Sequence, residues 1–184
     1  DHPLFARGLS QLIETQKDYK VTGIAKNHDE AIELLKELSP DLAIVDLNLG
    51  QEDGLELIKD ILSIKAQTKV LVLSMHDERY YADRALKAGA KGYIMKEEAE
   101  TNVSTAINTV MQGQIYLSQK EMKRQQELIK SQNHKSEDEP FDFISSLSDR
   151  QLQIFTLIGK GLGTVEIAEK LSLSIKTIDT HKEN

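Results

Sequence analysis

The sequence predicts an α/β domain with a mostly parallel sheet, followed by a small all-α domain. Three observations lead to this order. Short apolar runs alternate with helical patterns over residues 1–116, a polar stretch occupies residues 117–145, and helical patterns alone fill residues 146–184. The length of 184 residues also suits two domains, because roughly 100–200 residues is a usual domain size.

The first region alternates predicted strands with predicted helices. The strands are YKVTGIA at 19–25, LAIVD at 42–46, VLVLS at 70–74 and KGYIM at 91–95. Apolar residues at helical spacing predict helices over 2–14, 29–38, 55–64, 79–87 and 98–111. This alternation indicates βαβ units. A helix begins with no strand before it, and residue 184 lies inside a helical pattern, so we expect a missing first strand and two incomplete ends.

The middle region resembles a linker. Residues 118–132 are rich in Gln, Lys and Glu and predict a polar helix. Residues 133–140 (NHKSEDEP) have no apolar residue and end in Pro, which is typical of a flexible hinge. We therefore divide the chain into domains at 1–116 and 146–184, with a linker over 117–145.

The last region predicts three short helices. Ser148 is a candidate N-cap for a helix over 147–160, a second helix spans Thr164–Lys170, and Ser174 can cap a third that begins at Ile175. Helix, short turn, helix is the arrangement that places the second helix in the DNA major groove. The pattern alone also fits a three-helix bundle without a DNA function.

Composition narrows the function classes. The chain has no Cys, which excludes disulfide frameworks, thiol catalysis and thiolate zinc sites. No apolar run approaches the roughly 18 residues that a membrane helix needs. The net charge is −7, and nearly all of the acidic excess falls within residues 1–116. We expect a cytoplasmic regulator or enzyme that does not contact membranes.

Polar residues follow the predicted strands. Asp46, Ser74 and Lys96 each end or follow a strand, and Asp1 lies where a preceding strand would end. The carboxyl ends of parallel strands form the usual site of such sheets. Carboxylates are ligands for Mg²⁺, an aspartate can attack phosphorus, and a lysine and a hydroxyl can bind phosphoryl oxygens. A strand-terminal Asp taken alone is more often a cap or a turn residue.

Four segments together resemble the receiver domain of two-component response regulators of the NarL/FixJ subfamily. They are DHPLFARGL, DLAIVDLNLGQEDGLELI, VLVLSMHDE and ALKAGAKGYIMKE. The resemblance covers residues 1–116 and implies a flavodoxin-like (βα)5 fold. It also implies that Asp46 takes a phosphoryl group from a histidine kinase, becoming an aspartyl phosphate. It implies that Asp1, Asp46 and the Asn48 carbonyl bind Mg²⁺. It also implies that Ser74 and Lys96 bind the phosphoryl group and that Tyr93 is an aromatic switch residue.

Residues 147–184 are similar to the LuxR-type helix-turn-helix. The resemblance implies that Thr164–Glu183 is the helix-turn-helix and that the recognition helix begins at Ile175. The candidates for phosphate contacts are Lys176, Thr177 and Lys182, and those facing the groove are Asp179, Thr180 and Glu183. The family's fourth helix, which commonly mediates dimerisation on DNA, lies beyond residue 184, so we expect a truncated domain.

These features predict a response regulator that controls transcription by binding double-stranded DNA, as a homodimer when phosphorylated or DNA-bound, and that is not an enzyme. An aspartate-nucleophile phosphatase is one alternative, although such enzymes usually have an acid where Asn48 stands. A degenerate receiver is the other, although Asp46, Ser74 and Lys96 are all present. We also hypothesise that His76 and the Asn48 side chain tune dephosphorylation; the alternative for His76 is a solvated loop residue.

Overall fold

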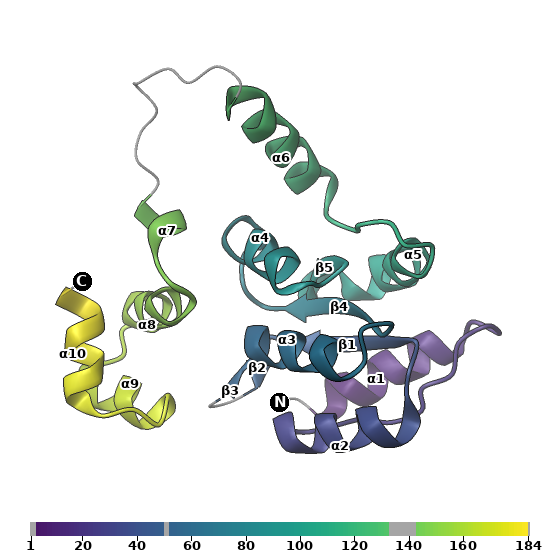
Figure 1. Cartoon of the computed structure of the whole chain (residues 1–184), viewed down its shortest axis with the longest axis horizontal. Helices are drawn as coiled ribbons and strands as arrows, with labels where there is room; N and C mark the ends of the chain where they lie inside the picture. The colour runs from purple at the N-terminus through teal and green to yellow at the C-terminus, as the bar shows by residue number, and fades with distance from the viewer. Residues whose placement is uncertain (1–2, 50–51, 133–142, 184) are drawn as a thin grey trace. The chain divides into compact units, whose positions relative to one another are not determined.

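The computed structural model describes residues 3–49, 52–132 and 143–183. It divides into two compact units, Asp1–His134 and Lys135–Asn184 (Figure 1). The hinge expected at 133–140 lies outside the described residues. Within the described ranges, no helix is both long enough and apolar enough to cross a membrane.

The first unit is built on three parallel strands, in the order β1-β4-β5. They are β1 (Leu42–Asp46), β4 (Lys69–Ser74) and β5 (Gly92–Met95). β4 is the central strand, and Val70, Leu71 and Val72 within it are fully buried. This burial follows from the place of β4 between β1 and β5, with helices on both faces of the sheet.

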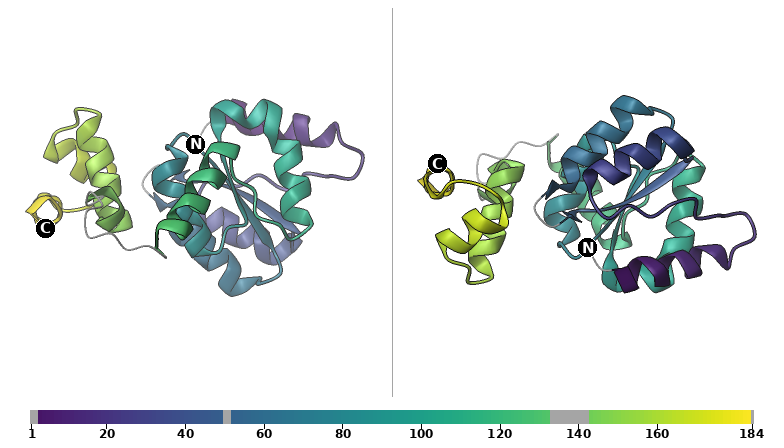
Figure 2. Two further views of the ribbon diagram at one scale, coloured as in Figure 1. Left: turned by 90° about the horizontal axis from the view of Figure 1, so that it is seen from above. Right: turned by 90° about the horizontal axis from the view of Figure 1, so that it is seen from below.

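Helices cover both faces of this sheet (Figure 2). α1 and α5 pack on one face, where Ile13, Leu71, Leu73, Ile94 and Val103 belong to one buried cluster. α3 and α4 pack on the other face, and α2 lies against α3. The bounds are α1 (Pro3–Glu14), α2 (His28–Leu38), α3 (Gly54–Ile64), α4 (Glu78–Ala88), the 3-10 helix η1 (Lys96–Glu98), α5 (Ala99–Met111) and α6 (Gln119–Gln132).

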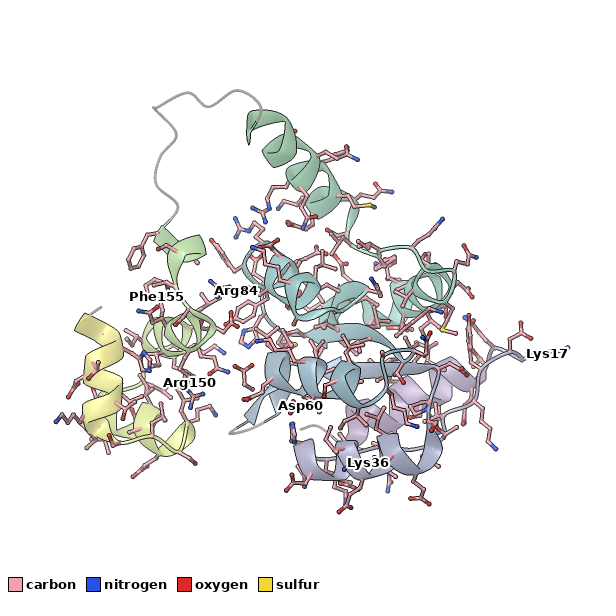
Figure 3. The ribbon with its side chains drawn as sticks, viewed as in Figure 1. Lys17, Lys36, Asp60, Arg84, Arg150 and Phe155 are labelled. Atoms are coloured by element: carbon pink, nitrogen blue, oxygen red, sulfur yellow. The ribbon has the colours of Figure 1, made fainter. Side chains whose placement is uncertain are left out.

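Side-chain caps begin three of these helices. Asn27, Asp53 and Asp77 each accept a hydrogen bond from a backbone N–H in the first turn of α2, α3 and α4. The His28 ring and the Asp60 carboxylate, 2.9 Å apart, connect the start of α2 to α3 (Asp60 is labelled in Figure 3). The five helices expected over 2–111 are confirmed, and no end shifts by more than one residue.

The strand predicted at Tyr19–Ala25 is wrong. Residues 19–25 adopt no regular structure, although Tyr19 and Val21 pack against the buried cluster. A strand needs a hydrogen-bonding neighbour, and β1 pairs with β4 alone among the described strands. Residues of 19–25 and of β1 line a cavity of about 610 Å³ instead. High β-propensity therefore does not make a strand here.

A short antiparallel pair follows β1. β2 (Asn48–Leu49) pairs with β3 (Glu52–Asp53), and α3 begins directly afterwards at Gly54. A Cβ atom on Gly54 would lie 2.6 Å from the Leu47 Cα and 2.9 Å from the Asp46 carbonyl oxygen. Glycine is therefore the residue that lets α3 approach the backbone that follows Asp46.

The second unit contains α7 (Phe143–Ser146), α8 (Asp149–Gly159), α9 (Thr164–Lys170) and α10 (Ile175–Glu183). Ser148 forms a capping box with Gln151, which confirms the expected N-cap. Ser174 accepts a hydrogen bond from the Thr177 N–H at 3.0 Å, which confirms the second cap. The sequence did not predict α7, whose Phe143 ring lies 6.4 Å from that of Phe155.

Candidate functional site

The carboxyl ends of the three parallel strands bring the predicted site residues to one edge. Asp46 pairs with Leu73 across β1 and β4, and Ser74, the next residue along, pairs with Met95 of β5. Lys96 follows Met95 at the start of η1. Three residues far apart in the sequence therefore converge because each ends or follows one of three adjacent strands.

Asp46 and Lys96 form an ion pair between the Lys96 ammonium and the Asp46 Oδ2. The Lys96 side chain is 6% exposed and that of Asp46 is 18% exposed, so the pair is largely shielded from water. The Phe5 ring of α1 lies beneath the ammonium, with its centroid 5.2 Å from Nζ. A partly desolvated lysine beside the carboxylate can attract a phosphoryl donor and hold its oxygens.

Ser74 is fully buried and belongs to a local network. Its Oγ accepts a hydrogen bond from the His76 N–H at 3.0 Å, and the Tyr93 hydroxyl donates to the His76 carbonyl at 2.8 Å. The His76 ring stacks on Tyr81 of α4, with ring centroids 4.4 Å apart. The sequence therefore located Ser74 and Tyr93 in one place, and His76 connects them.

Tyr93 is already inside the protein, because its side chain is 1% exposed. Burial raises the pKa of its hydroxyl, and hydrogen bonding to Ser74 opposes that rise. The phenol is thus neutral and acts as a hydrogen-bond donor. Its contact with the loop after β4 links β5 to the start of α4.

Asp1 and Asn48 are the other two predicted metal ligands. Asp1 lies outside the described residues. Asn48 lies at the start of β2, two residues after Asp46. No group of three or more His, Cys, Asp or Glu side chains in the described ranges could hold a metal ion. Asp46 is therefore the described carboxylate of the predicted site, and its hard oxygens suit Mg²⁺.

Two contacts were not predicted from the sequence. Phe5 forms part of an ordinary apolar helix pattern, which carries no signal of a contact with Lys96. Glu78, the first residue of α4, is 7% exposed and accepts a hydrogen bond from the Ser118 N–H at 2.9 Å. Burial raises the pKa of its carboxyl, and nothing in the sequence distinguishes it from a solvated glutamate.

In the second unit, α9, a short turn and α10 follow one another as expected. Ile178 of α10 is fully buried and packs in one cluster with Ile154 and Ile167 of α8 and α9. Arg150, labelled in Figure 3, donates to the Leu171 carbonyl at 2.9 Å and connects α8 to the turn. These contacts fix α10 against the other two helices, so its opposite side can face a partner.

The predicted DNA contacts lie mainly on that opposite side. Lys176, Asp179, Thr180 and Lys182 are exposed, and Thr177 is partly buried. Two of them already have partners within the unit: the Lys182 ammonium donates to the Thr164 hydroxyl at 2.9 Å, and the Thr177 hydroxyl bonds Ser174 at 2.7 Å. The Glu183 side chain lies outside the part of the chain whose side chains are described.

Comparison with known proteins identifies both units. The profile of the family described as "Response regulator receiver domain" matches residues 1–108, and that of "Bacterial regulatory proteins, luxR family" matches residues 145–184. The oxygen regulatory protein NreC of Staphylococcus haemolyticus (strain JCSC1435) is 37% identical over 186 residues, covering 99% of this chain and 84% of that protein.

Two solved structures of response regulators are similar to this chain. RcsB of Salmonella enterica serovar Typhimurium, bound to promoter rprA in the presence of phosphomimetic BeF3-, has a TM-score of 0.67 and 25% identity, covering 100% of this chain and 85% of that one. A LuxR-family two-component response regulator from Aurantimonas sp. SI85-9A1 has a TM-score of 0.64 and 29% identity, covering 72% of this chain and 93% of that one. The chain belongs to the two-component response regulators of the NarL/FixJ type, which are DNA-binding transcriptional regulators.

Proposed function

We propose that Asp46 is the residue that accepts the phosphoryl group. The observation that carries this proposal is the ion pair of Asp46 with Lys96 at the strand edge that also bears Ser74. An Asp46 oxygen attacks the phosphorus of the donor, the new O–P bond forms, and the donor's leaving group departs with the bond electrons. The Lys96 ammonium stabilises the charge on the transferred group, and the Ser74 hydroxyl donates a hydrogen bond to it.

Receiver domains typically bind Mg²⁺, and the hard oxygen donors at this edge fit that ion. In this chain Asp46, Asp1 and the backbone carbonyl of Asn48 would hold the ion. It would supply positive charge that offsets the negative charge of the carboxylate and of the incoming phosphoryl group. Lys96 adds its own positive charge beside Asp46.

The output of the protein is DNA binding by the second unit. Family members bind DNA and receive phosphoryl groups from histidine kinases. We assign a receiver to 1–116, a linker to 117–145 and the helix-turn-helix domain to 146–184. α10 reads the major groove of promoter DNA, and phosphorylated chains pair as homodimers, because paired half-sites need paired modules. The protein acts in the cytoplasm, where its DNA lies, and its only chemistry is self-catalysed phosphotransfer and dephosphorylation.

The phosphorylation assignment is tested with acetyl phosphate and Mg²⁺. The wild-type chain should gain the mass of one phosphoryl group, and Asp46→Asn should not. Asp41→Asn is the matched control, because Asp41 is an exposed carboxylate just before β1, at the opposite end of that strand from Asp46. A phosphoryl adduct that persists in Asp46→Asn refutes the assignment.

The DNA contacts need a separate test. Lys176 is exposed on α10, and its ammonium is a candidate for a phosphate contact. Lys176→Ala should weaken binding to duplexes of any sequence and lower the salt dependence of log K by about one. Lys170→Ala, at the end of α9, serves as a comparison of equal charge. An unchanged salt dependence in Lys176→Ala removes this residue from the interface.

A further inference from the structure

Helix α6 is attached to the start of α4 by polar groups. The Glu78 carboxylate accepts from the Ser118 N–H at 2.9 Å, and the Ser118 hydroxyl accepts from the Glu121 N–H at 3.1 Å. The Arg124 guanidinium donates to both oxygens of Glu121, at 2.7 and 2.8 Å, and to the Arg79 carbonyl at 2.9 Å. Two of these contacts, Ser118 with Glu78 and Arg124 with the Arg79 carbonyl, join α6 and the residue before it to the first turn of α4. The hydrogen bonds to Glu121 lie within the start of α6 and hold Ser118 and Arg124 in place.

The two carboxylates of this joint, Glu78 and Glu121, are buried although they can carry charge. Four polar or charged residues are buried in the described part of the chain, and Glu78, Glu121 and Ser74 are three of them. Burying a carboxylate is unfavourable unless hydrogen bonds compensate it. Glu78 therefore depends on the Ser118 N–H, and any shift of Glu78 weakens the joint.

The segment 74–78 connects Glu78 to the proposed phosphorylation site. Ser74 lies at its beginning and Glu78 at its end, four residues later. Between them, the His76 N–H donates to Ser74, and Asp77 caps α4 through the Arg79 N–H at 3.0 Å. A change in the hydrogen bonding of Ser74 therefore moves residues that hold Glu78 in place.

We propose that Glu78 is a positioning residue that couples phosphorylation of Asp46 to the release of helix α6. The inference rests on the proposed function. When Ser74 turns its hydroxyl toward the phosphoryl group, the His76 N–H loses its acceptor and the segment 74–78 shifts. Glu78 then loses the Ser118 N–H, and α6 separates from α4. α6 belongs to the segment 117–145 that we assign as the linker before the DNA-binding unit, so its release changes the tether of that unit.

Hydrogen exchange on the full chain tests this coupling, followed by mass spectrometry of peptides that cover residues 118–127. In the wild type, acetyl phosphate with Mg²⁺ should raise the exchange rate of these amides about tenfold or more, as expected for the loss of a hydrogen bond to a charged group. Glu78→Ala should show fast exchange in both states while Asp46 is phosphorylated normally. Glu78→Gln should restore slow exchange before phosphorylation, because its amide oxygen can still accept from Ser118.

Glu100→Ala is the matched control, since Glu100 is an exposed glutamate in the first turn of α5, and it should behave as the wild type. If Glu78→Ala does not fold, Glu78→Asp keeps the charge but shortens the reach by one methylene and should give the same fast exchange. Slow exchange in Glu78→Ala, or phosphorylated wild type with unchanged α6 exchange, overturns the coupling and leaves the proposed function intact. A chain that gains no phosphoryl mass overturns both.

Discussion

Replacing Gly54 with alanine should destabilise the first unit, because its Cβ has no room. The new atom would lie 2.6 Å from the Leu47 Cα and 2.9 Å from the Asp46 carbonyl oxygen. Both are backbone atoms, which cannot rotate away as a side chain can. Overpacking of this kind typically costs about 1–3 kcal/mol, and rigid neighbours favour the upper end. The higher helix propensity of alanine offsets less than about 1 kcal/mol of this loss in stability.

The net loss is therefore about 2 kcal/mol in the free energy of unfolding. With a urea slope of roughly 2 kcal/mol per molar, the midpoint falls by about 1 M. Tyrosine fluorescence reports this transition selectively, because all five tyrosines lie within residues 1–116 and the chain has no tryptophan. The second unit is therefore silent in this assay.

Gly8 provides the matched control. It lies within α1, and a Cβ atom there would meet nothing within 4 Å. Gly8→Ala should raise the midpoint, since alanine gains up to about 1 kcal/mol over glycine inside a helix. If Gly54→Ala raises the midpoint in the same way, the backbone contact does not constrain this position and the reasoning is refuted. Gly54→Ala should also slow phosphorylation, because relief of the clash displaces the backbone that carries Asp46.

Three further predictions concern other groups. Burial, together with the charges of Glu121 and Glu98, raises the pKa of Glu78 against the lowering effect of its hydrogen bond with Ser118. The free energy of unfolding of the wild type should therefore fall relative to that of Glu78→Gln as the pH rises from below 4.5 through the raised pKa of the folded state. Urea melts of both proteins from pH 4 to 7 measure this difference. A difference that does not change with pH would contradict the prediction. Asp77→Ala should cost about 1 kcal/mol in the same melts through the lost cap of α4, whereas Asp77→Asn should change them little. Ile178→Ala should cost the second unit about 2–5 kcal/mol, seen as lost helical circular dichroism with an unchanged tyrosine transition.

The sequence predicted most elements of the fold because local patterns determine them. Apolar spacing located α1 to α5, and the hydroxyl caps at Ser148 and Ser174 located two helices of the second unit. The failure at residues 19–25 has the opposite cause. Whether an extended segment becomes a strand depends on a neighbour elsewhere in the chain, which propensity does not describe.

The residues of the candidate site also differ in whether the sequence predicts them. Asp46, Ser74 and Lys96 could be predicted, because a residue at the end of a strand keeps that place whatever packs around it. Glu78 and Phe5 could not, because their roles come from the docking of another helix. Glu78 is bound by the N–H of Ser118, just before α6, and α6 has few apolar residues that would predict where it packs.

The composition of this joint bears on what it can do. Leu117, 3% exposed, is an apolar anchor just before α6, while the hydrogen bonds that reach α4 are those of Ser118 with Glu78 and of Arg124 with the Arg79 carbonyl. Exposing apolar surface to water raises the free energy, so a joint made of apolar side chains resists opening. Charged groups regain hydration on exposure, so a joint made from them opens at a smaller net cost. A polar attachment that follows an apolar anchor at Leu117 therefore fits the release of α6 that we propose for the phosphorylated protein.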